Sequence, residues 1–160
     1  MLDITVNDLA FTHIRIKDVN GEYHDYDILD ELKIDEYNLE KELQLQPGKY
    51  VYWSSILEQV RSYLESAELQ EEHTKANLYE VARNTLIAEG TPKPTKDQID
   101  SWILRQEEFI QAKEQVNTFN NYVKQLNFVV KALEQRHSML VQLSALKRDQ
   151  RNYQNAINNI

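Results

Sequence analysis

The sequence predicts a mainly α protein: a long antiparallel helical hairpin with short N-terminal helices and a small β-hairpin appendage. Apolar residues recur at helical spacing for roughly forty residues or more on both sides of a single break at Gly90–Thr95. Gly and Pro number only three each in 160 residues, which is typical of extended helical proteins. Near the N-terminus, two short stretches flank Val19-Asn20-Gly21, a sequence typical of a hairpin turn.

Residues 1–28 are predicted to form the β-hairpin appendage. A three-residue turn pairs Asp18 with Glu22, Ile16 with His24, Ile14 with Tyr26 and Thr12 with Ile28. The apolar members of these pairs then share one face, and Arg15 lies opposite Asp25 on the other. Because an isolated hairpin is marginally stable in water, we expect this one to pack against the helices or another subunit.

Residues 29–47 are predicted to form a short acidic helical segment. Its leucines recur at helical spacing, which indicates one or two short helices: Leu29, Leu32, Leu39 and Leu43. We expect Gln46-Pro47-Gly48 to end this segment, because proline and glycine disfavour the interior of a helix.

The two-helix hairpin is predicted over residues 48–152, with helices at 48–89 and 96–151. Residues 153–160 are rich in amides and are expected to form a flexible tail. The apolar stripe of the second helix starts with three residues at coiled-coil steps: Ile99, Ile103 and Ile110.

Independent signals place the break between the two helices. Gly90 suits the left-handed position after a helix end, and Pro92 and Pro94 cannot continue a helix. Thr95 can cap the next helix, and Gln98 three residues later supplies the reciprocal arm of a capping box. The break is therefore predicted to be a helix-to-helix turn.

The second helix carries more apolar surface than the first can cover. Folding about the break places residue i near about 185 − i, so Trp53 lies near Ala132 and the first helix ends opposite about residue 136. Either the acidic segment or another copy of the chain covers the apolar residues beyond that point. Because long amphipathic helices gain stability mainly from packing, we predict a homo-oligomer with these residues at its interface: Met139, Leu140, Leu143 and Leu146.

The composition excludes several function classes. The net charge is −8, but residues 1–90 hold 8 basic and 19 acidic residues, whereas residues 91–160 hold 10 and 7. The second half is therefore mildly basic, which permits phosphate contacts. The absence of Cys excludes disulfides, thiolate catalysis and Cys-based metal sites. No apolar run approaches the roughly 18 residues of a membrane span, and the start of the chain opens no signal peptide.

No enzymatic site is predicted. Glu134 and His137 have the Glu-x-x-His spacing of di-iron bundles, but such sites need the motif twice and two further Glu, and this sequence has it once. His137 lies on the apolar stripe and is interpreted as a core or interface residue. Since no glycine-rich phosphate loop occurs either, we expect no cofactor and no metal.

Several segments of the chain resemble the UvsY-like recombination mediators of tailed phages. They are Ile34-Asp35-Glu36-Tyr37-Asn38-Leu39-Glu40, Gln46-Pro47, Tyr50-Val51-Tyr52-Trp53, Arg83, Lys93-Pro94-Thr95 and Ala132-Leu133-Glu134-Gln135-Arg136-His137-Ser138-Met139-Leu140. The match covers about residues 30–150. Its most specific pieces are the turn before the Lys-Pro-Thr capping box and the Ala-Leu-x-x-Arg-x-x-x-Leu run.

The resemblance implies a small, ring-forming, non-enzymatic accessory protein. Such a protein binds single-stranded DNA and helps a phage or host recombinase displace the single-strand-binding protein, in the cytoplasm of a bacterial host cell. The acidic N-terminal module departs from this pattern, because it disfavours strong DNA binding by a monomer. A homo-oligomeric ring compensates through avidity.

One face of the second helix is the first candidate site for nucleic acid. Polar residues recur there at three- and four-residue steps without a carboxylate, a pattern that suits contacts with a sugar-phosphate backbone: Lys113, Asn117, Asn120, Lys124, Asn127, Lys131, Gln135 and Ser138. The alternative is an ordinary solvated or subunit-facing surface.

Further candidates come from the resemblance and from a basic cluster. Lys93, Arg83 and Arg136 match family positions, although both arginines equally suit ion pairs within the hairpin, through carboxylates such as Glu80 or Glu134. Lys147, Arg148 and Arg151 form this cluster after the last apolar turn, where they also complement the helix dipole. Three aromatic residues either stack on bases or pack the start of the first helix: Tyr50, Tyr52 and Trp53.

Two hypotheses of function follow. The first is a recombination mediator that binds single-stranded DNA, which rests on the resemblance and the basic second half. The second is an oligomeric phage adaptor or structural protein, or an inhibitor of a host factor, without nucleic-acid binding. The second hypothesis rests on the net charge of −8 and the surplus apolar stripe.

Overall fold

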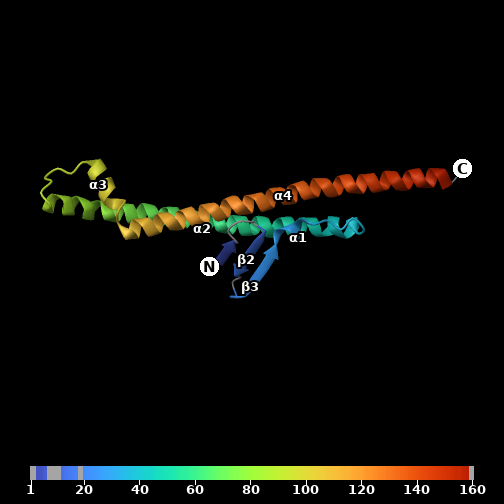
Figure 1. Cartoon of the computed structure of the whole chain (residues 1–160), viewed down its shortest axis with the longest axis horizontal. Coiled ribbons are helices and arrows are strands. Elements are labelled where there is room, and N and C mark those ends of the chain that lie inside the picture. Colours follow the sequence, from blue (N-terminus) through green and yellow to red (C-terminus); the bar gives the residue numbers. More distant parts are fainter. Residues whose placement is uncertain (1–2, 7–11, 18–19, 159–160) are drawn as a thin grey trace. The chain divides into compact units, whose positions relative to one another are not determined.

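The computed structural model describes residues 3–6, 12–17 and 20–158 and is mainly α, as predicted (Figure 1). The elements in chain order are β1 (Asp3–Val6), β2 (His13–Lys17), β3 (Tyr23–Asp27), α1 (Ile28–Leu32), α2 (Leu39–Ala88), α3 (Lys96–Ile103) and α4 (Glu107–Asn158).

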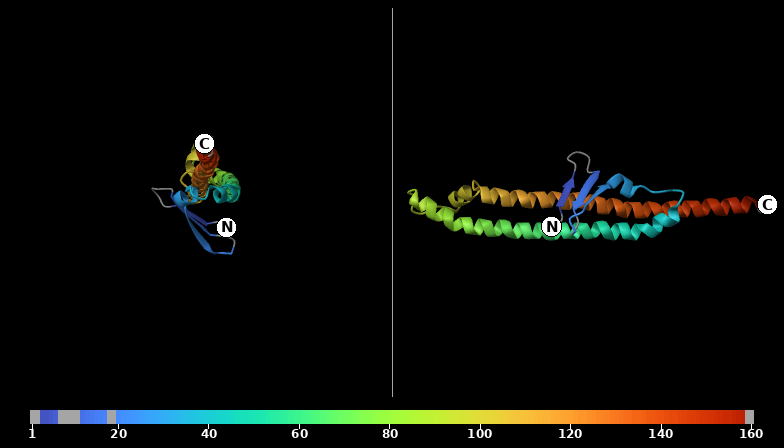
Figure 2. Two further views of the ribbon diagram at one scale, coloured as in Figure 1. Left: turned by 90° about the vertical axis from the view of Figure 1, so that its right-hand side faces the viewer. Right: turned by 90° about the horizontal axis from the view of Figure 1, so that it is seen from below.

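The chain divides into two compact units, and both long helices contribute to both. One unit contains Met1–Leu57 and Lys124–Ile160, and the other contains Glu58–Val123. Within each unit, a stretch of α2 runs antiparallel to a stretch of α4 (Figure 2). Their contacts follow the predicted pairing of residue i with about 185 − i: Tyr50 contacts Glu134 in the first unit, and Glu71 contacts Lys113 in the second.

The N-terminal strands form a three-stranded antiparallel sheet in the order β1-β2-β3. The predicted hairpin register is confirmed, because Ile14 pairs with Tyr26 and Ile16 with His24. The turn contains Gly21 with a φ of 88°, while Asp18, the predicted partner of Glu22, and the turn residue Val19 lie outside the described residues. Strand β1 was not predicted, and it adds a third strand along β2.

The two faces of the sheet differ as the register requires. Ile14 and Ile16 are buried against the rest of the unit. On the outer face, Arg15 donates two hydrogen bonds to the Asp25 carboxylate, at 2.7 and 3.1 Å. These hydrogen bonds, with the positive charge of Arg15, lower the pKa of Asp25 below its ordinary value of 3.8.

Helix α1 follows β3 directly. The side chain of Asp27 caps it by accepting a hydrogen bond of 2.8 Å from the Leu29 amide and one of 3.4 Å from the Asp30 amide. This is one of the short helices predicted within residues 29–47. The other is absent as a separate element, because α2 already begins at Leu39.

The predicted helix end at Gln46-Pro47-Gly48 is wrong. Helix α2 passes through Pro47, although proline cannot donate the backbone hydrogen bond of that turn. The reason lies in tertiary contacts, since the Gln46 side chain is buried and donates a 2.7 Å hydrogen bond to the Leu133 carbonyl on α4. These contacts hold the backbone helical where the local sequence disfavours it.

The core of the first unit lies between α2, α4 and the inner face of the sheet. Trp53 is buried and meets the ring of Tyr26 edge to face, with 5.2 Å between centroids. Other buried apolar residues of this unit include Ile28, Leu126, Leu133 and Leu140. The β-hairpin therefore packs against the helices, as one of the two predicted alternatives requires.

The turn after α2 has the predicted chemistry. Gly90 has a φ of 98°, and the Thr91 amide donates a 2.9 Å hydrogen bond back to the Leu86 carbonyl, as in a glycine-terminated helix. Thr95 caps α3, and its capping box with Gln98 is complete in both directions. The break is thus set by residues close to one another in the chain.

The predicted second helix at 96–151 is interrupted. Helix α3 ends at Ile103, and α4 begins at Glu107. In a continuous helix, Ile103 and Phe109 would point about 120° apart, at about 100° per residue. Because of the interruption, the side chains of Ile103 and Phe109 both pack in one cluster with Leu78. Ile110, which was assigned to the apolar stripe, is exposed.

The C-terminal end of α4 also differs from the prediction. Residues 153–158, expected to be a flexible tail, are helical as far as Asn158. Their side chains are exposed, and in the first unit the last turns of α4 continue beyond the start of α2 (Figure 1).

Candidate nucleic-acid interface

The part of α4 that lies in the first unit carries an exposed basic face. Lys124 and Lys131 are exposed, as are Gln135 and Ser138. These positions differ by three, four or seven residues, which places their side chains on one side of a helix. Among the described residues, neither Lys124 nor Lys131 forms an ion pair. Both ammonium groups are therefore available to an anion.

An aromatic side chain lies within this face. Phe128 is 68% exposed and comes four residues after Lys124 and three before Lys131. Sequence reasoning missed Phe128 because it does not fit the apolar stripe. Its spacing from the two lysines was the available signal. An exposed aromatic ring between cations is the combination that single-stranded nucleic acids bind.

In the second unit, the charge of the predicted basic face is partly neutralised within the protein. Lys113 forms an ion pair with Glu71, with 3.8 Å between Nζ and Oε1, and its ammonium lies 5.6 Å from the centre of the Phe109 ring. Asn117 is exposed and Asn120 is half-buried. The charge of Lys113 is therefore partly satisfied within the protein.

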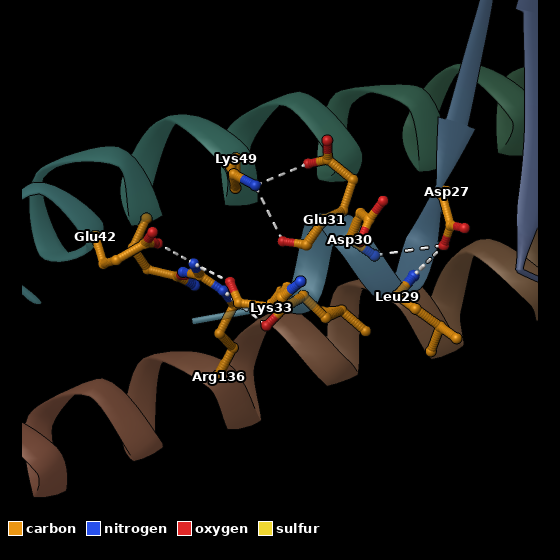
Figure 3. A network of polar contacts seen from close by, with 10 residues as sticks. Asp27, Leu29, Asp30, Glu31, Lys33, Glu42, Lys49 and Arg136 are labelled. Atoms are coloured by element: carbon orange, nitrogen blue, oxygen red, sulfur yellow. Dashed lines mark hydrogen bonds and ion pairs between the residues drawn. The ribbon is translucent and has the colours of Figure 1, made fainter. Parts of the chain in front are cut away.

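Arg136, predicted to bind nucleic acid, is a structural residue instead. Only 2% of it is exposed. Its guanidinium donates to the Leu32 carbonyl at 3.1 Å and the Lys33 carbonyl at 2.9 Å, and it also binds the side chains of Glu42 and Gln46 (Figure 3). The ion pair within the hairpin was the correct alternative, with Glu42 as partner in place of Glu134.

This arginine joins three segments of the first unit. The carbonyls come from the end of α1, the side chains of Glu42 and Gln46 come from α2, and Arg136 itself projects from α4. A second link lies nearby, where the Lys49 ammonium binds both the carboxylate and the carbonyl of Glu31 (Figure 3). The position of α1 against the helical hairpin is therefore set by charge-assisted hydrogen bonds.

The remaining basic candidates are dispersed. Lys147 donates to the Glu36 carbonyl, while Arg148, the next residue, is exposed. Lys93 and Arg83 are exposed and belong to the other unit. The structure therefore brings Lys124 and Lys131 together on one face of the first unit, and it does not place Arg136 there.

The predicted oligomer interface is corrected in part. Leu140 is fully buried within the chain, because α2 starts at Leu39 and covers more of α4 than expected. Leu143 is half-buried. Met139 and Leu146 are 54% and 58% exposed, so these two residues remain accessible to a partner.

The three aromatic residues at the start of the hairpin make contacts within the chain. Trp53 is buried and cannot stack on a base. The Tyr52 ring contacts Tyr26 and Trp53, and the Tyr50 hydroxyl donates a 3.2 Å hydrogen bond to Glu134. Packing is therefore the main role of this group.

His137 is exposed beside a cavity between α2 and α4, with Pro47 and Tyr50 on the opposite wall. Of the two predicted roles of His137, that of a core residue is wrong, and that of an interface residue stays a prediction. Within the described part of the chain, no three His, Asp or Glu side chains are arranged to hold a metal ion. None of the described helices has the length and apolar character needed to cross a membrane.

Comparisons of the chain with protein-family models, with curated proteins and with solved structures find no match.

Proposed function

We propose that this chain is a non-enzymatic, UvsY-like recombination mediator that binds single-stranded DNA as a homo-oligomer and assists the loading of a recombinase. One observation carries the proposal: Lys124 and Lys131 are exposed on one face of α4 and lack ion pairs with described residues. The resemblance of the sequence to phage mediators adds the biological setting, the cytoplasm of a bacterial host.

The arrangement suits phosphates better than base edges. The two lysines lie about 10 Å apart along the helix axis, at about 1.5 Å per residue, and each neutralises one phosphate of a bound strand. Gln135 and Ser138 extend the face with hydrogen-bonding groups. Contacts of this kind give affinity without sequence preference.

Two lysines in one protomer make a weak site, and the net charge of −8 opposes it. Several copies of the chain on one strand raise the affinity through effective concentration. Met139 and Leu146 are the exposed apolar residues through which we propose that copies associate. The proposed protein partners are the recombinase and the single-strand-binding protein that it displaces.

The test is fluorescence anisotropy with a long oligothymidylate at several salt concentrations. We expect salt-sensitive binding, and the slope of log K against log salt should fall in magnitude by about 0.7 for each lysine removed. The variant is Lys124→Glu with Lys131→Glu, and the matched control reverses two exposed lysines elsewhere: Lys41→Glu with Lys96→Glu. Equal losses in the two variants, or no binding by the wild type, would rule out this function.

A second candidate function is an oligomeric adaptor without nucleic-acid binding. The exposure of Met139 and Leu146 on a chain of net charge −8 favours it. Under this alternative, the Lys124 and Lys131 variant behaves as the wild type in every binding assay. Light scattering of Met139→Ser with Leu146→Ser tests the shared requirement for self-association, since a loss of mass is expected under both functions.

A further inference from the structure

A small apolar cavity opens beside the basic face of α4. Its volume is about 190 Å³, which is below the range of about 300–1,000 Å³ typical of sites for drug-sized ligands. It lies between the sheet, α1 and α4, all within the first unit. Its walls are Ile14, Ile28, Leu32, Gln125, Phe128, Val129 and Ala132.

Phe128 differs from the other apolar walls of this cavity. Ile14, Ile28 and Val129 are buried, whereas Phe128 is 68% exposed and leaves much of its ring in water. A ligand that covers this ring removes apolar surface from water, which is favourable. The exposed ring offers a flat surface to a second planar group.

Gln125 gives the cavity a polar feature without a partner. Its side-chain Oε1 is buried and accepts no hydrogen bond from any described residue. A buried acceptor of this kind is costly, and a ligand with an N–H donor removes the cost once the Gln125 amide turns toward the cavity that this residue lines. The cavity therefore combines one exposed ring with one unsatisfied acceptor.

The charges around the cavity indicate which ligand carries that donor. Lys124 and Lys131 lie four residues before and three after Phe128, so two exposed ammonium groups lie on the face of α4 beside this ring. Neither is neutralised by a described carboxylate. The ligand should therefore be planar, carry an N–H donor and be attached to negative charge on both sides.

We propose that this cavity is a base-binding subsite for single-stranded nucleic acid. One base stacks on Phe128 and donates an N–H hydrogen bond to Gln125 Oε1, while the adjoining phosphates contact Lys124 and Lys131. Each base has an N–H donor on its pairing edge, so the subsite discriminates little among sequences. The inference rests on the proposed function and adds the base contact to it.

The experiment compares two oligonucleotides of equal length, one with bases and one with an abasic backbone. Wild-type protein should bind the strand with bases more tightly. Phe128→Leu should weaken that binding by about tenfold, within the range that loss of one stacking contact produces, and should leave binding of the abasic strand unchanged. Gln125→Met should weaken binding of the strand with bases and leave binding of the abasic strand unchanged. Tyr153→Leu, which removes an exposed aromatic ring elsewhere on α4, is the matched control.

A direct readout supplements the affinities. The fluorescence of a 2-aminopurine base in the strand should be quenched on binding to wild type and should recover with Phe128→Leu. Thermal unfolding of each variant shows that the fold is retained, as expected for an exposed position.

The outcomes separate the two proposals. If the wild type binds both strands with equal affinity, and the double variant Lys124→Glu with Lys131→Glu binds neither, the base subsite is overturned. The proposed function is retained in that case. No binding of either strand overturns both. If Phe128→Leu keeps full DNA affinity but lowers the mass in light scattering, the cavity belongs to a contact with a second copy, and the subsite is rejected.

Discussion

Gln46 donates a hydrogen bond of 2.7 Å from its side-chain Nε2 to the main-chain carbonyl of Leu133, 87 residues away in the chain. The bond lies beside Pro47, where the sequence predicts a helix end, and it couples α2 to α4 at that point. The same side chain accepts from Arg136. One buried amide on α2 thus binds both the backbone and a charged side chain of α4.

Arg136 should be essential for the stability of the first unit and dispensable for DNA contact. Arg136→Met leaves Glu42 and two carbonyls without their donor, and loss of one partner from a buried ion pair costs about 3–5 kcal/mol. Urea denaturation measures the loss. Arg148→Met, an exposed arginine on the same helix, should change stability by about 0.5 kcal/mol at most.

The double variant of Arg136→Met with Glu42→Met tests the cause. Replacing both members of a buried pair with apolar groups is often close to neutral, so part of the lost stability should return. If the double variant is as unstable as Arg136→Met alone, the uncompensated Glu42 charge is not the main cost.

Gly48→Ala should stabilise the protein. Gly48 lies inside α2, and a Cβ at this position meets no atom within 4 Å. The gain should be about 0.4–1 kcal/mol, because alanine restricts the unfolded chain more than glycine does. Thermal unfolding measures it. Gly90→Ala is the opposing control and should destabilise the protein, because a φ of 98° costs a residue with a Cβ about 1–2 kcal/mol. A rise in melting temperature with both variants would contradict this account.

Thr95→Ala should weaken the second unit at the start of α3. The Thr95 hydroxyl oxygen accepts a hydrogen bond from the Gln98 amide at 3.3 Å, and the Thr95 amide donates to Gln98 Oε1 at 2.9 Å. Loss of the cap should cost about 1 kcal/mol, measured by chemical denaturation. Thr95→Ser keeps the hydroxyl and should restore most of the difference. Amide hydrogen exchange should show the increased opening within residues 96–103.

Asp25 should titrate below its ordinary pKa of 3.8. The hydrogen bond from Arg15 is the main cause, so the carboxylate form is favoured in the folded sheet. Its stabilising contribution is therefore fully present above the unfolded pKa and is lost as pH falls through the lower folded value. NMR titration of the Asp25 side chain measures the midpoint. Arg15→Gln should raise it towards 3.8, and an unchanged midpoint would exclude Arg15 as the cause.

Much of the fold was predictable where the signal was local. The hairpin register followed from apolar alternation around Asn20 and Gly21, and the α2–α3 turn followed from Gly90 and Thr95. The candidate site was predictable only in part. Lys124 and Lys131 were identified by helical spacing, but the exposure of Phe128 and the burial of Arg136 depend on what covers each side of α4.

Amino-acid types and their spacing were sufficient for the helical hairpin, its turn and the exposed lysines, because each depends on residues within a few positions of one another. Tertiary contacts decided the helical path through Pro47, the interruption between Ile103 and Glu107 and the burial of Arg136. The physical reason is that buried hydrogen bonds and apolar contacts between distant segments outweigh local backbone preferences. Arg136 illustrates this, since its carbonyl partners lie 103 and 104 residues away.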